Sequence, residues 1–507
     1  MTDTDTSYFP IRGLIEGFYG SYYTFPERDD LIRFSGRHGY NLYIYGPKND
    51  RQHRMRWWEP YPARTMARFG RTVEVAREAG VMFCYAISFG VPIAYASEDD
   101  FRIVAAKLRA FYDLGVRSFA VLMDDTASGL AHEVNRAHYR GVVEAHADLC
   151  NRLYAWLQTL GEPCALRLCQ AEYHGIAGDV RDVRDVRDAG GAEDVPFSRH
   201  LSDLGAQLHP DIDLFYSGRA ICAPTITVED IRAFTATAGR APLIWDNYPV
   251  NDLEMRREMH LGPLRGRDPA LHRVVKGVVV NPMVQPEASK IPLLTYADYL
   301  RDPDAYDPER SWDAALREIA GEDSARELRL FAENWLCSCV DAPGGAPLKR
   351  RADAALAELR AGAPASSSAA VRALEAYFVD IDESGYHLKN HMENLALRQN
   401  ILPWIETLED WMWMGRRALT ALRAIEAGAP NDVSVRIVKR SLDDLRRNMY
   451  RSGGEALAPL AEHVLACAGH DDRRDAARGP DIDLPSPSET ANEAFTTAPP
   501  GSQGVSA

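Results

Sequence analysis

The sequence predicts an α/β fold, a (β/α)8 barrel, followed by a domain made only of helices. Short and almost continuously apolar segments alternate with amphipathic segments from residue 11 to about residue 305. Apolar runs without polar alternation are typical of parallel strands that are buried on both faces. Eight such runs in under 300 residues match the size of a (β/α)8 barrel. Between residues 306 and 469 the β-type segments disappear and helical periodicity predominates.

The eight predicted strands are rich in β-branched and aromatic residues and are bounded by turn residues. In chain order they are residues 13–20, 40–48, 81–90, 118–125, 164–173, 213–218, 242–249 and 274–282. An open, doubly wound sheet is the structural alternative. It usually carries a glycine-rich phosphate-binding turn after its first strand, and the segment GFYGSYY at residues 17–23 lacks that pattern.

Amphipathic helices are predicted between the strands. The first begins at a capping box, Thr24 to Glu27, and ends near Gly39. The other helices predicted in the barrel are residues 63–79, 98–114, 131–160, 197–208, 228–238 and a short one at 296–300. Helical segments at 312–321, 323–336, 351–362, 370–399, 404–428 and 433–450 predict a bundle as the second domain.

The two ends of the chain are expected to be tails. Residues 1–10 precede the barrel (11–305), and the bundle (306–469) is followed by residues 470–507, which are rich in Pro, Ser and Gly and are predicted to be disordered. A triple Asp-Val-Arg repeat at residues 179–187 is expected to be a solvated loop or helix face.

Composition excludes several classes of function. The net charge of -15 argues against a nucleic-acid surface, which needs a basic stripe. No apolar run is long enough to cross a membrane, and no secretory signal opens the chain. Eight Cys without a CxxC pattern suggest buried thiols in a reducing compartment, and the close pair Cys337 and Cys339 lacks partners for a zinc site. We expect a soluble cytoplasmic protein.

Polar and aromatic residues gather at the predicted carboxyl ends of the strands. They are Glu16, Gly17, Lys48, Asn49, Asp50, Asp124, Asp125, Glu172, Tyr173, His174, Trp245, Asp246, Asn247 and Asn281, with Asp252 shortly after the seventh strand. In a barrel these ends share one face, where active sites lie. Directional hydrogen bonds and aromatic faces suit a sugar. Taken singly, each residue also has an ordinary explanation as a turn, a cap or barrel packing.

The adjacent carboxylates Asp124 and Asp125 close the fourth strand. Two nearby carboxylates repel when both are ionised, so one retains a proton more easily and the pair can supply an acid and a base. Adjacent residues cannot flank a glycosidic bond, as the two carboxylates of ordinary retaining and inverting glycosidases do. They suit substrate-assisted hydrolysis, in which one orients a 2-acetamido group and the other transfers the proton. A solvated loop pair is the alternative.

At these residues the sequence resembles the family 84 glycoside hydrolases, β-N-acetylglucosaminidases that include the protein O-GlcNAcases. The resemblance covers about residues 11–300. It rests on segments 13–20, 41–50, 53–54, 58–61, 85–88, 118–125, 172–173, 244–247, 251–252, 261–263 and 281–282. Departures are Met123 before the aspartates, Thr126-Ala-Ser-Gly129 after them, and Gly46 where Ala is usual.

The resemblance implies a role for each site residue and a retaining exo-β-N-acetylglucosaminidase that uses no metal and no cofactor. Asp124 resembles the residue that orients the acetamido group, and Asp125 resembles the general acid/base. Residues that resemble sugar-hydroxyl ligands are Gly17, Lys48, Asp252 and Asn281, and those that resemble the wall of the acetamido pocket are Tyr173, Trp245 and Asn247. The expected partner is a GlcNAc-containing glycoconjugate, such as an O-GlcNAc-modified protein, and some relatives dimerise through the helical domain.

Three alternatives stay open from the sequence. The enzyme could act on hyaluronan or on amino-sugar oligosaccharides. The chain could bind GlcNAc without turning it over, with the helical domain as its working part. A metal-dependent barrel hydrolase would need several ligands at the strand ends, and His174 with the two aspartates is too small a set.

Overall fold

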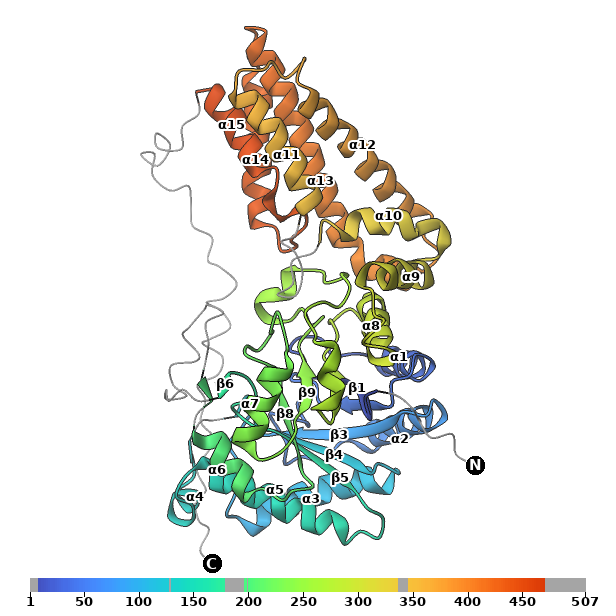
Figure 1. The fold of residues 1–507 in the computed structure, drawn as a ribbon, viewed down its shortest axis with the longest axis vertical. Coiled ribbons are helices and arrows are strands. Elements are labelled where there is room, and N and C mark those ends of the chain that lie inside the picture. Colours follow the sequence, from blue (N-terminus) through green and yellow to red (C-terminus); the bar gives the residue numbers. More distant parts are fainter. Residues whose placement is uncertain (1–7, 127–128, 178–195, 198, 336–344, 470–507) are drawn as a thin grey trace, which may run out of the picture.

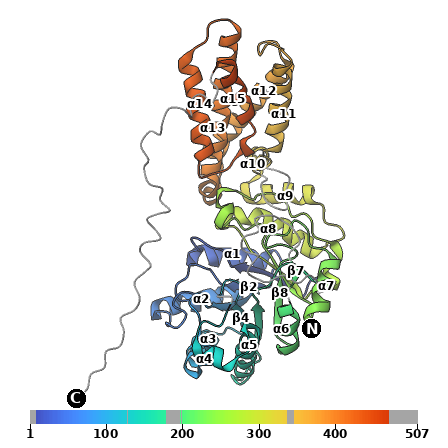
Figure 2. The ribbon, with the colours of Figure 1, turned by 90° about the vertical axis from the view of Figure 1, so that its left-hand side faces the viewer.

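The computed structural model describes residues 8–126, 129–177, 196–197, 199–335 and 345–469. The described chain forms a barrel and an elongated group of helices, with α8 and α9 between them (Figure 1). The same arrangement is visible in the view turned by 90° (Figure 2). The predicted tail at 470–507, the Asp-Val-Arg repeat and the pair Cys337 and Cys339 lie outside the described residues.

Eight parallel strands close into a barrel, and this confirms the predicted fold class. They are β1 (Ile11–Glu16), β2 (Leu42–Tyr45), β3 (Met82–Ser88), β4 (Ser118–Leu122), β5 (Ala165–Cys169), β8 (Asp213–Tyr216), β9 (Leu243–Asp246) and β10 (Gly277–Val280). Each pairs with its neighbours in chain order, and β10 pairs with β1. Closure excludes the open sheet. A separate short pair, β6 (Ile176–Ala177) and β7 (Pro196–Phe197), lies between β5 and β8 in the chain.

The helices around the barrel follow the prediction with one clear difference. They are α1 (Phe25–Arg37), α2 (Ala63–Glu78), α3 (Glu98–Asp113), α4 (Glu133–His138), α5 (Val142–Gln158), α6 (Arg199–Gln207), α7 (Val228–Ala238) and α8 (Pro286–Arg301). The capping box at Thr24 is present. The single helix predicted at 131–160 is wrong, because the extended backbone at Tyr139 and Gly141 separates α4 from α5. The buried Tyr139 donates its hydroxyl to Asp148 at 2.7 Å.

A second difference concerns the last helix of the barrel. The short helix predicted at 296–300 is the end of the longer α8, which contains Pro292 within its length. A proline in a helix interior removes a hydrogen bond and normally predicts a helix end. Between β9 and β10 the described chain has two 3-10 turns, η2 (Leu253–Arg257) and η3 (Pro269–Arg273), in place of an α-helix.

The second domain is helical, as predicted. Its helices are α9 (Pro308–Ala320), α10 (Glu322–Ala332), α11 (Ala346–Arg360), α12 (Ala369–Asn390), α13 (Leu395–Glu426), α14 (Asp432–Arg447) and α15 (Ala458–Cys467), with a 3-10 turn η4 (Gly453–Glu455). The predicted segment 370–399 is split because Asn394 caps the start of α13 with its side chain. Helix α15 was not predicted.

A buried ion pair ties the first strand to the first helix. Glu16 and Arg28 are both almost fully buried, and Arg28 donates to the two Glu16 carboxylate oxygens at 2.7 and 2.9 Å. Tyr43 and the backbone of Tyr23 also donate to Glu16. Because every lone pair of the carboxylate is engaged, the pair fixes α1 against the barrel and positions the loop that follows β1.

The bundle contacts the barrel near its functional face. The carbonyl oxygen of Arg257, at the end of η2, accepts from the backbone N–H of Arg451 at 2.6 Å and from the indole of Trp404 at 3.0 Å. Arg257 in turn donates to the carbonyl of Asn448 at 2.5 Å. The helical domain therefore holds one end of a barrel turn whose other end lines the cavity described below.

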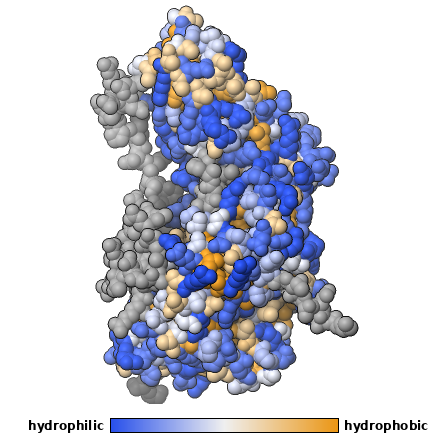
Figure 3. Space-filling model, in the orientation of Figure 1, coloured by the Kyte–Doolittle hydropathy of each residue, from blue (hydrophilic) through white to orange (hydrophobic). Residues whose placement is uncertain are grey.

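Hydrophilic residues cover most of the face drawn in Figure 3, over the barrel and the bundle alike. Among the described residues, no helix combines the length and the apolar character that crossing a membrane requires.

We predict that Arg28→Met destabilises the protein by about 3–5 kcal/mol, because it leaves the Glu16 carboxylate buried without its charged partner. Urea unfolding followed by tryptophan fluorescence measures the loss. The matched control is Arg77→Met on α2, where Arg77 forms an exposed pair with Glu74 and the unfolding midpoint should not move. Equal midpoints for the two variants would contradict a structural role for the buried pair.

Candidate active site

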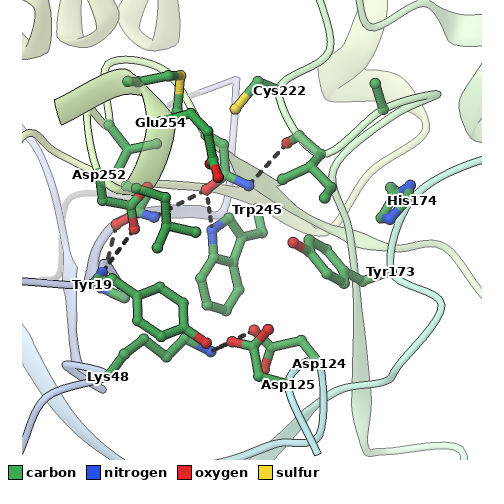
Figure 4. A pocket seen from close by; sticks show the side chains of 18 of the residues that line it. Tyr19, Lys48, Asp124, Asp125, Tyr173, His174, Cys222, Trp245, Asp252 and Glu254 are labelled. Carbon is green, nitrogen blue, oxygen red and sulfur yellow. Dashed lines mark hydrogen bonds and ion pairs between the residues drawn. The ribbon is translucent and has the colours of Figure 1, made fainter. Parts of the chain in front are cut away.

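A cavity of about 440 Å³ opens at the carboxyl ends of the barrel strands (Figure 4). All nine residues to which the resemblance gives a role lie around it: Gly17, Lys48, Asp124, Asp125, Tyr173, Trp245, Asn247, Asp252 and Asn281. His174 is the one other predicted strand-end residue that lines the cavity, whereas Glu16, Asn49, Asp50, Glu172 and Asp246 do not. The residues that line it come from six of the eight strand ends, since each lies within or after β1, β2, β4, β5, β9 or β10. The barrel therefore brings together residues that are up to 264 positions apart in the chain.

Lys48 bridges the two aspartates that follow β4. Its Nζ lies 2.5 Å from Asp124 Oδ2 and 2.8 Å from Asp125 Oδ2. The Lys48 and Asp124 side chains are 2% and 5% exposed, whereas that of Asp125 is 33% exposed. Asp124 thus lies at the base of the cavity and Asp125 nearer to its opening. The Oδ1 atom of Asp124 is buried and has no hydrogen-bond partner among the described residues.

Burial and the attraction between opposite charges act in opposite directions on the pKa values of Lys48, Asp124 and Asp125. Burial alone would lower the pKa of the Lys48 ammonium, but Asp124 and Asp125 outweigh it and raise that pKa above its usual value. Burial also raises the pKa of Asp124, with Lys48 opposing and Asp125 reinforcing the shift. The pKa of Asp125 is lowered, because the charge and hydrogen bond of Lys48 and the nearby Tyr19 hydroxyl and Arg54 outweigh its partial burial. In the empty cavity the retained proton is therefore favoured on Asp124.

A chain of hydrogen bonds fixes the wall opposite the aspartates. The indole of Trp245 donates to Asn247 Oδ1 at 2.8 Å, and Asn281 Nδ2 donates to the same oxygen at 3.0 Å. Asn281 Oδ1 accepts from the backbone N–H of Gly17 at 3.3 Å. Gly17 is required here, since a Cβ at this position would lie 2.6 Å from the Trp245 ring. These contacts hold a flat indole face toward the cavity.

Three further side chains complete the predicted set. Tyr173 lies beside Trp245, with ring centroids 6.1 Å apart, and burial raises the pKa of its phenol well above the usual value. His174 lines the cavity beyond Tyr173 (Figure 4), and burial lowers its pKa to about 4, so the imidazole is neutral at pH 7. Asp252 accepts from the backbone N–H of Tyr19 at 2.7 Å, and burial raises its pKa.

The cavity also has lining residues that the sequence interpretation missed. They are Tyr19, Arg219, Ala220, Ile221, Cys222, Val250, Leu253, Glu254 and Met255. The strand-end rule could have found the segment 219–222, because it follows β8 closely. Residues 253–255 could not be found in this way, because they reach the cavity through the turn η2 that the bundle holds.

Gly46 has a local explanation. A Cβ there would lie 3.0 Å from Leu122 Cδ1 and 3.3 Å from Ala86 Cβ, so the glycine relieves crowding inside this barrel. Among the residues that the structure describes, no group of three or more His, Cys, Asp or Glu side chains is arranged to hold a metal ion.

Comparison with known proteins agrees with this geometry. The family model described as beta-N-acetylglucosaminidase matches residues 12–333. The protein O-GlcNAcase of Mus musculus is 31% identical over 289 residues, which are 57% of this chain and 30% of the mouse protein. The chain therefore spans about a third of the length of that curated relative.

Solved structures extend the similarity to most of the chain. The O-GlcNAc hydrolase of Thermobaculum terrenum superposes with a TM-score of 0.82 at 28% identity, covering 93% of this chain and 98% of that one. The protein CpGH84B superposes with a TM-score of 0.75, also at 28% identity, covering 90% of this chain and 77% of that one. With a family model that matches more than half of its residues, the chain belongs to the β-N-acetylglucosaminidases of glycoside hydrolase family 84.

Proposed function

We propose that this protein is a retaining exo-β-N-acetylglucosaminidase that removes terminal β-linked GlcNAc by substrate-assisted catalysis, with O-GlcNAc-modified proteins as the substrate class. The observation that carries the proposal is the asymmetric pair Asp124 and Asp125, with Lys48 between them in the cavity at the carboxyl ends of the strands. The curated relative is named a protein O-GlcNAcase, and a solved relative is titled an O-GlcNAc hydrolase.

Asp124 is suited to orient the 2-acetamido group. Its Oδ1 is buried without a partner among the described residues, and a buried carboxylate oxygen without a donor costs free energy that an arriving N–H can recover. The N–H of an N-acetyl group is such a donor. By accepting it, Asp124 would turn the acetamido carbonyl oxygen toward the anomeric carbon and stabilise the positive charge that develops on the amide.

Asp125 is suited to transfer the proton. Its side chain is the more exposed of the two, so it faces the side of the cavity where the leaving group departs. In the first step the acetamido oxygen forms a bond to the anomeric carbon, the glycosidic bond breaks, and Asp125 gives its proton to the departing oxygen. An oxazoline ring remains, still protonated on the nitrogen whose N–H is bonded to Asp124. In the second step Asp125 removes a proton from water, the water oxygen bonds to the anomeric carbon, and the bond from that carbon to the acetamido oxygen breaks, which restores the acetamido group and the β configuration.

Substrate binding would have to move the proton between the two carboxylates. In the empty cavity the pKa of Asp124 is raised and that of Asp125 is lowered, the reverse of what the first step requires. A hydrogen bond from the substrate amide favours the ionised form of Asp124, while a sugar that covers Asp125 removes water and favours its protonated form. Both changes act in the required direction, and the coupling through Lys48 links them.

The opposite wall supplies binding. The faces of Trp245 and Tyr173 can pack against the acetamido methyl group and the sugar ring, while Asp252, Asn281 and Lys48 carry polar atoms for the ring hydroxyls. Dimerisation through the helical domain and a cytoplasmic location stay predictions.

The first test replaces each aspartate. We expect Asp124→Asn and Asp125→Asn each to lower kcat/KM on 4-nitrophenyl β-N-acetylglucosaminide by about 10²–10⁴-fold, which is the usual contribution of such groups. With 2,4-dinitrophenyl as the leaving group, azide should restore turnover to Asp125→Asn, because azide attacks the oxazoline without a base. Azide should not rescue Asp124→Asn.

The matched control is Asp113→Asn, which removes an exposed carboxylate on α3 that pairs with Arg109. It should keep the wild-type rate. Full activity in both site variants would refute the assignment, and rescue of Asp124→Asn alone would exchange the two roles.

The second test uses a stable mimic of the cyclised intermediate. A GlcNAc-thiazoline should inhibit at concentrations at least about a hundredfold below the KM of the aryl glycoside, since sites bind such mimics better than substrates. Calorimetry should show the affinity falling sharply in Asp124→Asn. Inhibition no stronger than that by free GlcNAc would contradict a mechanism through an oxazoline.

A further inference from the structure

Arg54 lies against the proposed acid/base without lining the cavity. It belongs to the turn segment after β2, and its Nη2 donates to the backbone carbonyl oxygen of Asp125 at 3.2 Å. Its Nε is buried and has no hydrogen-bond partner among the described residues. The side chain passes close to Gly90, where an added Cβ would lie 2.7 Å from Arg54 Cγ. The guanidinium is therefore packed in a fixed place.

Arg54 also contacts Tyr19, the second neighbour of Asp125. The guanidinium carbon lies 5.4 Å from the centroid of the Tyr19 ring, within the range of a cation–π interaction. The Tyr19 hydroxyl lies close enough to the Asp125 carboxylate for that charge to add to burial in raising the pKa of the phenol, while the backbone N–H of Tyr19 donates to Asp252. Figure 4 shows the Tyr19 ring beside the tip of Lys48, with its hydroxyl directed at the aspartates.

The contacts on the two aspartates differ in kind. Lys48 binds both carboxylates directly, whereas Arg54 contacts the main chain of Asp125 and the ring of Tyr19, whose hydroxyl is directed at the aspartates. Asp125 follows the end of β4 by three residues, so its peptide is outside the sheet ladder. A planar guanidinium that holds this peptide on one side and Tyr19 on the other limits the directions that the carboxylate can take.

We propose that Arg54 is a positioning residue that aims the carboxyl group of Asp125 at the leaving-group oxygen, acting through the Asp125 peptide and the Tyr19 hydroxyl. The inference rests on the proposed function, because it assumes that Asp125 transfers the proton. It predicts which substrates are hydrolysed more slowly when Arg54 is replaced. Protonation of the leaving-group oxygen contributes little to the rate when the leaving phenol is acidic and much when it is weakly acidic. A misoriented acid therefore slows the hydrolysis only of glycosides with a weakly acidic phenol.

The test compares two aryl β-N-acetylglucosaminides, one with 2,4-dinitrophenol and one with unsubstituted phenol as the leaving group. For Arg54→Met, kcat/KM on the phenyl glycoside should fall by about tenfold or more, while the value on the dinitrophenyl glycoside stays within about twofold. Tyr19→Phe should follow the same pattern. Arg54→Lys should be intermediate, since it keeps the charge but not the planar fork. The control Arg51→Met, at an exposed position in the same turn, should match the wild type.

The pH profile gives a second readout. The charged and titratable groups that face Asp125 are Lys48, Asp124, Tyr19, Arg54, Asp252, Tyr173 and Cys169. Lys48, Tyr19 and Arg54 lower the pKa of Asp125. For the first step the two carboxyl groups must hold one proton between them, so kcat/KM falls as pH rises through the apparent pKa at which the pair in the free enzyme loses that proton. Removing Arg54 raises the pKa and should move the alkaline limb of kcat/KM to higher pH.

Equal losses on the two glycosides with an unmoved alkaline limb would overturn the proposal and leave Arg54 a purely structural residue. Wild-type rates in all three variants would overturn it as well. If Arg54→Met does not fold, as judged by its melting temperature, Arg54→Lys and Tyr19→Phe decide the outcome. If the proposed function itself is wrong, the wild type cleaves neither glycoside, so this failure can be distinguished from failure of the role proposed for Arg54.

Discussion

The contact on which the rest of the site depends is one ammonium group held between two carboxylates. The cost of placing two carboxyl groups side by side at the barrel mouth is offset because Lys48 lies within 2.8 Å of both aspartates. The arrangement leaves one buried oxygen, Asp124 Oδ1, without a hydrogen-bond partner among the described residues. An amide N–H satisfies that oxygen, so the empty site is complementary to the acetamido group of its proposed substrate.

Rigid supports keep this trio in place. The Glu16 and Arg28 pair holds the loop after β1, the Asn281 and Asn247 amides orient the Trp245 indole, and Trp404 with Arg451 secures the turn that carries Leu253 to Met255. Each support lies outside the reacting centre. Preorganised polar groups on rigid elements are the means by which enzymes stabilise developing charge, and here the helical domain contributes to one of them.

The strand-end rule predicted fifteen residues at one face, because parallel strands in a closed barrel bring all their carboxyl ends together, and ten of them line the cavity. The choice of nine among them came from the resemblance to a known family. The sequence could not predict the contacts that depend on how the chain returns to the cavity after it leaves a strand. Arg54 lies well past β2, and the segment 253–255 is placed by contacts with the bundle. The break at Tyr139 and the length of α8 were missed because a buried tyrosine and a tolerated Pro292 override local propensity.

The most direct measurement of the central claim is the rate of aryl glycosides whose 2-acetamido methyl group carries zero, one, two or three fluorines. Fluorine withdraws electrons from the carbonyl oxygen. If that oxygen is the nucleophile, as this account holds, kcat should fall with each fluorine, by about tenfold or more over the series. A kcat that does not respond to fluorination would mean that an enzyme group attacks the anomeric carbon, and the roles given to Asp124 and Asp125 would be wrong.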